Sequence, residues 1–196
     1  MHFFAEIKDY VGFSEEDEQR LQELAPVLSP YFERVVDRFY DALNQNPRTR
    51  DVFTGPDQVE RLRQTLHEWL EELFEGPHDQ AYFEQRQRIG QVHVDVGLLP
   101  QFMFGAMNIV RIELIRAMRE ADVDDMPEAV EAVERALDID LTIMSQSYWD
   151  SLMEMKLQIP SALATGLAHE IRNPLNTIGL QMTLLERRLR EYTTDA

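Results

Sequence analysis

The stretch RIGQVHVDVGLLPQFMFGA, residues 88–106, decides the fold of the chain because it places a histidine inside an apolar helix. Steps of three and four residues from His93 reach Ile89 and Val96, so these side chains share one helical face. An imidazole in such an interior needs a hydrogen-bond partner or a metal. Spacing alone favours a core histidine bonded to a backbone carbonyl, and it leaves a metal ligand as the alternative.

The residues around this stretch predict a chain made of helices. Gly97 is suited to a left-handed helix end near Val96, and Pro100 can open the next helix. Apolar side chains recur at helical spacing almost everywhere, while the alternation typical of strands is rare. The expected helices are 14–26, 31–43, 59–74, 79–96, 100–120, 127–159 and 161–196, with Ser14 and Asp79 as N-caps and Pro26 and Pro30 as interruptions. The predicted fold class is all-α.

Composition excludes several classes of partner and chemistry. The formal charge of −17 argues against binding to nucleic acid or to an anionic membrane surface. The chain has no cysteine, which excludes disulfides, thiolate metal sites and covalent haem attachment. The most apolar stretch, residues 98–110, is too short to cross a bilayer, and the first residues do not form a signal peptide. We therefore expect a soluble, cytoplasmic protein.

The segment 88–106, with WLEELFEGPHDQAYF (69–83) ahead of it, resembles the globin-coupled sensors, the haem-binding sensory globins of bacteria. The resemblance runs from about Phe32 to Met118 and centres on the pattern H-x-x-x-G-L-x-P that begins at His93. It implies a globin-like sensor domain that binds haem b, with His93 as the proximal iron ligand and a gas such as O2 as the sensed molecule. Some members of the family have lost haem, so a haem-free globin-like signalling or interaction module is the alternative.

The same resemblance suggests which residues form the distal side of the haem pocket, opposite His93. Tyr40, in DRFYDAL, matches a tyrosine that often hydrogen-bonds the ligand in this family, and a buried tyrosine with a bonded hydroxyl is the alternative. His67 is a weaker candidate for a distal ligand, and we expect it to be partly exposed. His78 lies in a Gly-Pro-His-Asp turn and is expected to be solvated. An aromatic set fits either a porphyrin pocket or an ordinary core: Phe32, Phe39, Tyr40, Trp69, Phe74, Phe102 and Phe104.

A second motif, LAHEIRNPLNTI (167–178), lies in the last predicted helix. The apolar residues of that helix recur at alternating steps of four and three from Ala164 to Leu189, as in a coiled coil or bundle. His169 lies off this seam, with Glu170 beside it and Asn173 one turn further on. We expect the His169 ring to be exposed, where it could accept a phosphoryl group while a carboxylate takes its proton.

HEIRNPL closely resembles the phospho-acceptor box of sensor histidine kinases. The resemblance implies that His169 is phosphorylated, that Glu170 is the general base, and that Asn173 supports phosphotransfer or dephosphorylation. No ATP-binding motifs follow, so we expect a truncated kinase that is inactive alone, with ATP and Mg²⁺ bound only by a missing catalytic domain. The alternative is a surface His-Glu pair beside a tolerated proline.

Together these observations predict two domains and a signal that passes from the first to the second. Residues 1–155 form the sensor domain, and residues 156–196 begin the dimerisation and phospho-acceptor domain of the kinase. Apolar residues spaced by threes and fours along 127–159 predict a parallel homodimer built on long helices. The predicted function is a gas or redox sensor in which ligand at the haem controls phosphorylation of His169 and transfer to a response regulator.

Overall fold

The chain is helical throughout the part that the computed structural model describes, residues 2–154. In chain order the elements are α1 (His2–Val11), α2 (Glu15–Leu28), η1 (Ser29–Tyr31), α3 (Phe32–Gln45), α4 (Pro47–Arg50), α5 (Pro56–Glu75), α6 (Gln80–Asp95) and α7 (Pro100–Glu120). A further helix, named here the last helix, covers residues 126–154. The predicted all-α fold class is confirmed.

Local chemistry accounts for most helix ends. Ser14 caps α2 in a capping box, in which its hydroxyl accepts from the backbone of Asp17 and the Asp17 carboxylate accepts from the backbone of Ser14. Asp79 caps α6 by accepting from the backbone N–H groups of Ala81 and Tyr82 at 2.9 and 3.1 Å. Gly97 has φ +70°, the left-handed conformation that lets the chain leave α6. These caps were predicted from the sequence.

Two helix predictions at the N-terminal end were wrong. Residues 2–11 form α1, which the sequence reading did not include. Pro26 does not interrupt its helix but lies inside α2, close to the C-terminal end of that helix. The missing amide of Pro26 removes one hydrogen bond from α2, and a 3-10 turn at Ser29–Tyr31, rather than a break, carries the chain into α3.

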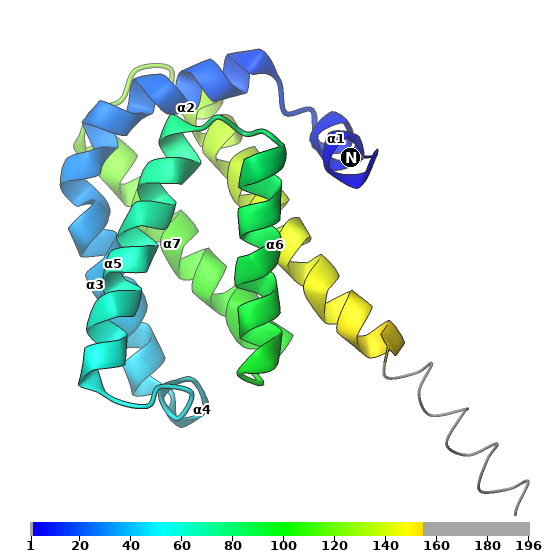
Figure 1. Cartoon of the computed structure of the whole chain (residues 1–196). Coiled ribbons are helices and arrows are strands. Elements are labelled where there is room, and N and C mark those ends of the chain that lie inside the picture. The colour runs from blue at the N-terminus through cyan, green and yellow to red at the C-terminus, as the bar shows by residue number, and fades with distance from the viewer. Residues whose placement is uncertain (1, 155–196) are drawn as a thin grey trace, which may run out of the picture. The chain divides into compact units, whose positions relative to one another are not determined.

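The helices enclose one apolar core. α2 packs against α5, and α3 packs against both α5 and α7 (Figure 1). α5 and α6 follow one another through a short connection and run in opposite directions, in cyan-green and green (Figure 1). The most completely buried side chains include Phe32, Phe74, Leu70, Leu114 and Leu137. This packing fixes α3, α5, α6 and α7 as the frame of the pocket described below.

The chain divides into two compact units, Met1–Trp149 and Asp150–Ala196. In the second unit the structure describes only residues 150–154, so the predicted boundary between residues 155 and 156 stays a prediction. No helix within the described residues is long and apolar enough to cross a membrane.

Candidate functional site

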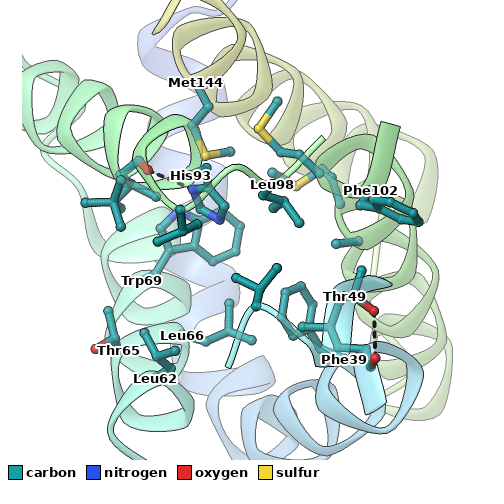
Figure 2. Close-up of a pocket in the computed structure, with 18 of the residues that line it drawn as sticks. Phe39, Thr49, Leu62, Thr65, Leu66, Trp69, His93, Leu98, Phe102 and Met144 are labelled. Atoms are coloured by element: carbon teal, nitrogen blue, oxygen red, sulfur yellow. Dashed lines mark hydrogen bonds between the residues drawn. The ribbon is translucent and has the colours of Figure 1, made fainter. Parts of the chain in front are cut away.

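A cavity of about 440 Å³ lies between α3, α5, α6 and α7 and also reaches Met144 of the last helix. Its walls are mostly apolar, with Phe39 from α3, Leu62 and Leu66 from α5, and Phe102 from α7 (Figure 2). Pockets for small molecules and cofactors typically measure about 300–1,000 Å³ and combine apolar walls with a few polar groups. The cavity therefore has the size and lining of a cofactor pocket.

His93 lies in the wall of this cavity, near Trp69 and Met144 (Figure 2). Its Nδ1 atom is 2.7 Å from the backbone oxygen of Ile89, one turn earlier on α6. A carbonyl oxygen can only accept, so Nδ1 carries the proton and Nε2 keeps its lone pair. Burial lowers the pKa of His93, against the raising effect of the Ile89 hydrogen bond. The ring is therefore held neutral, with one nitrogen able to bind a metal.

Tyr40 lines the same cavity from α3 and is 5% exposed. Burial raises the pKa of Tyr40 to about 12, although the positive charge of Arg63 lowers it in part. The hydroxyl is thus protonated at neutral pH. Among the described residues, none forms a hydrogen bond with it, which leaves the Tyr40 hydroxyl available as a donor to a ligand in the cavity.

The predicted aromatic set divides between the cavity and the core. Phe39, Tyr40, Trp69 and Phe102 line the cavity. Phe32 and Phe74 instead stack on one another in the core with ring centroids 5.5 Å apart. Phe104 is 48% exposed and belongs to neither group. Helical spacing does not distinguish a pocket wall from a core, because both need apolar faces.

His67 and His78 do not line the cavity. His67 is partly exposed, as expected, with Nδ1 3.5 Å from Glu71 and its ring edge-on to Phe32. His78 was predicted to be solvated, and that prediction was wrong, because the residue is 6% exposed. Its Nε2 donates to the Leu73 carbonyl at 3.0 Å, and its Nδ1 lies 3.3 Å from the Glu18 carboxylate.

A buried polar network that the sequence did not reveal connects α6 with its neighbours. Arg86 and Asp140 are both fully buried, and Arg86 Nε donates to the Asp140 carboxylate at 2.8 Å. The same carboxylate accepts from the hydroxyl of Tyr82 at 2.5 Å, while Arg86 also donates to Glu72 at 2.7 Å and to the Trp69 carbonyl at 3.3 Å. Each buried charge is therefore paired and hydrogen-bonded.

Three of the predicted site residues fall outside the described part of the chain. His169, Glu170 and Asn173 lie beyond residue 154, so the structure brings together only the two predicted pocket residues, His93 and Tyr40. Within the described residues no group of three or more His, Cys, Asp or Glu side chains could hold a metal ion.

Comparison with protein families matches residues 2–154 to the Protoglobin family. The chain belongs to the protoglobin family. Its structure is similar to the globin domain of a globin-coupled sensor from Geobacter sulfurreducens, with 37% identity, a TM-score of 0.69, and coverage of 74% of this chain and 96% of that one. The expected sensor-globin domain is confirmed by both findings.

Two further proteins are similar to the protoglobin chain, one in sequence and one in fold. The heme-based aerotactic transducer HemAT of Halobacterium salinarum is 30% identical over 192 residues, which cover 89% of this chain and 39% of the transducer. The globin domain of DosC from E. coli, in its ferric form, shares the fold at a TM-score of 0.63, with 14% identity and coverage of 72% of this chain and 99% of that one. The protoglobin chain thus spans well under half of the transducer.

Proposed function

We propose that this protoglobin domain binds haem b through His93 and acts as a gas sensor. The observation that carries the proposal is the His93 ring, held neutral with Nε2 unprotonated in the wall of a 440 Å³ apolar cavity. Imidazole with its second nitrogen bonded to a backbone carbonyl is a suitable axial ligand for haem iron. The relative from Halobacterium salinarum is a heme-based aerotactic transducer, which supports the same cofactor.

The residues of the cavity suit this cofactor. When bound, haem iron would supply a reversible binding site for a diatomic gas such as O2. Tyr40 has a protonated hydroxyl with no partner among the described residues, so it can donate a hydrogen bond to such a ligand. The apolar side chains around it, including Phe39, Leu66 and Val110, exclude water from the same space.

Packing beside His93 offers a route from the pocket to the last helix. Gly90, one turn before His93, lies so close to the last helix that a Cβ atom there would be 2.8 Å from the Cα of Met144. The Arg86–Asp140 ion pair joins the same two helices further along. A ligand that favours one position of α6 would therefore also favour one position of the last helix.

We propose that the signal ends at the phospho-acceptor motif of a longer histidine kinase. His169 would accept the phosphoryl group, Glu170 would take its proton, and Asn173 would support later transfer to a response regulator. ATP and Mg²⁺ would be bound by a catalytic domain outside this chain. The close match of HEIRNPL to the phospho-acceptor box of histidine kinases supports this output.

We also propose that the protein acts as a homodimer through the last helix. Its residues Trp149 and Leu152 are 53% and 50% exposed, although both are large and apolar. Pairing two copies along this helix would remove such side chains from water.

The haem proposal is tested by the visible absorption spectrum of the purified protein after addition of ferric protoporphyrin IX. We expect a Soret band for the unmodified chain and for His67→Ala, which removes a histidine outside the cavity. His93→Ala should lose most haem on gel filtration. A His93→Ala variant with full haem content would contradict the ligand assignment, and an unmodified chain without a Soret band would favour the haem-free module.

A further inference from the structure

The mouth of the cavity lies between α5 and α6. Four lining residues are exposed: Thr65 on α5, Arg88 and Val92 on α6, and Val96 directly after α6. The lining residues from α3, α7 and the last helix are buried or half-buried. A ligand that fills the cavity therefore has one edge at these two helices, where solvent reaches it.

Arg88 is the one cationic side chain that lines the cavity within the described part of the chain. The amide and hydroxyl groups near it are already used inside the protein. Gln85 donates to Glu72 at 2.8 Å, Gln58 accepts from Thr54 at 2.6 Å, and the Thr65 hydroxyl donates to the Arg61 carbonyl at 3.1 Å. Arg88 forms no ion pair or hydrogen bond with another described residue, even though the chain carries a net charge of −17.

We infer that Arg88 binds a carboxylate side chain of the porphyrin at the mouth, so that the pocket selects an acid-bearing macrocycle. This inference rests on the proposed haem binding. Arg88 lies five residues before His93 on α6, a rise of about 7.5 Å along the helix axis. A guanidinium group binds carboxylates through two parallel hydrogen bonds and stays charged at every relevant pH.

The residues that follow Arg88 on α6 fit the same orientation of the ligand. Val92 comes four residues later on the same stripe of α6 and is 57% exposed, and Val96, at the C-cap of α6, is 47% exposed. The apolar face of a macrocycle would cover them, whereas its carboxylate edge would remain with Arg88 and solvent. The mouth thus has one cationic side chain beside exposed apolar side chains. This arrangement fits a ring that has carboxylates on one edge and apolar faces.

The test compares ferric protoporphyrin IX with its dimethyl ester, which has the same ring and no carboxylates. The rate of loss of each ring to excess apomyoglobin is followed through the Soret band for the unmodified chain, Arg88→Gln and Arg88→Glu. Arg38→Glu is the matched control, because Arg38 is exposed on α3 and does not line the cavity. We expect Arg88→Gln to speed loss of the acid about two- to fivefold, as for a partly exposed ion pair, and Arg88→Glu to speed it further.

The ester makes the result specific to the carboxylate. Loss of the ester should be the same from the unmodified chain and from both Arg88 variants, and 1 M salt should reduce the difference seen with the acid. Equal effects of Arg88→Glu on acid and ester, or no effect on either, would overturn the inference while leaving haem binding intact. Failure of the unmodified chain to bind either ring would overturn both proposals.

Discussion

At the scale of the single residue, the hydroxyl of Tyr40 is the most informative group in the pocket. It is protonated, nearly buried and without a hydrogen-bond partner among the described residues, in a cavity lined mainly by apolar side chains. A buried polar group in that position costs stability unless something in the cavity bonds to it. A ligand in the cavity that accepts a hydrogen bond from Tyr40 would remove this cost.

Replacement of Tyr40 by Phe separates a role of the hydroxyl in ligand binding from a role in stability. The ring and its packing remain, so we expect the free energy of unfolding of the haem-free protein to change by less than about 1 kcal/mol. In the haem-loaded protein, O2 should leave up to about tenfold faster, because one hydrogen bond is lost. Stopped-flow measurement of O2 release checks the second effect, and an unchanged rate would show that Tyr40 does not contact the ligand.

A second residue, Glu18, makes stability depend on pH. Burial alone would raise the pKa of Glu18, but the backbone N–H of His78 at 2.9 Å, its ring, and the charge of Lys8 together lower that pKa below 4.5. A carboxyl with a lowered folded-state pKa stabilises the fold above its unfolded pKa. This contribution is therefore present above about pH 4.5 and is lost as the pH falls further.

Glu18→Gln should remove that dependence. We expect the variant to lose about 1–2 kcal/mol at pH 7, since it loses charge-assisted hydrogen bonds to His78. The difference from the unmodified protein should shrink as the pH falls below about 4.5. Urea unfolding at several pH values measures it, with Glu16→Gln on the exposed side of α2 as the control. A difference that stays constant with pH would argue against the assigned role of Glu18.

The sequence predicts the surroundings of some residues and not of others. The inward direction of His93 follows from helical periodicity, because only residues on its own helix are needed to see it. The burial of His78 could not be found that way, since Phe13, Glu18 and Tyr82 cover it from other parts of the chain. Turn composition near His78 indicated exposure, and tertiary contacts reversed it.

At the scale of the element, α6 approaches the last helix closely because residue 90 is a glycine and has no side chain. A Cβ atom at Gly90 would lie 2.7 Å from Ser147 Oγ, 2.8 Å from Met144 Cα and 2.9 Å from Met144 O. Two of these three atoms belong to the backbone of the last helix, so a larger residue would push the helices apart. Met144 itself lines the cavity, which joins this contact to the pocket.

Gly90→Ala should therefore destabilise the protein although alanine favours helices. We expect a loss of about 1–3 kcal/mol from overpacking, together with weaker haem retention as α6 shifts. Gly105→Ala on α7 is the control, because nothing lies within 4 Å of a Cβ atom there. That variant should gain up to about 1 kcal/mol from helix propensity. Thermal unfolding of both variants checks the opposite signs, and a stabilised Gly90→Ala protein would contradict the close contact.

Element boundaries were largely predictable, whereas the ties between elements were not. Ser14, Asp79, Gly97 and Pro100 act within a few residues of their own position, so their roles can be inferred locally. The Arg86–Asp140 pair joins residues 54 positions apart, and one sequence does not show which distant charges meet. The sequence likewise placed Phe104 in an aromatic set expected in a pocket or a core, but Phe104 is 48% exposed on α7.

At the scale of the whole molecule, the described part ends in a helix that exposes large apolar side chains. Trp149 and Leu152 lie near its C-terminal end. Such exposure in a long helix is typical of an interface. In the proposed sensor, the close contact between α6 and the last helix would connect this exposed surface to the pocket.

The proposed homodimer is tested by changing these exposed residues together. Trp149→Glu with Leu152→Glu should produce a monomer, because charged groups would have to be buried at the interface. The two side chains are about half exposed in the single chain, so we expect the helix content by circular dichroism to stay unchanged. Light scattering at micromolar concentration measures the mass. Two results would each remove the proposal: a monomeric unmodified chain, or a double variant that remains dimeric.

The last prediction concerns the separation of sensing from phosphorylation. His93 is a poor phosphoryl acceptor, since its Nδ1 is bonded to Ile89 and its ring lies in a cavity wall. ATP must deliver its γ-phosphoryl group in line and with Mg²⁺, which requires an accessible ring. His169 stands beside Glu170 in the HEIRNPL motif, well separated in sequence from the pocket residues.

In the proposed longer kinase, substitution of each of the two histidines should therefore abolish a different property. His169→Ala should abolish acid-labile phosphorylation from radiolabelled ATP and leave the haem spectrum unchanged. His93→Ala should remove the spectrum and retain phosphorylation, which would no longer respond to gas. His67→Ala should keep both properties, because His67 lies outside the cavity and outside the motif. Acid-labile label that persists on His169→Ala would show that another residue accepts the phosphoryl group, and the proposed output through HEIRNPL would then be wrong.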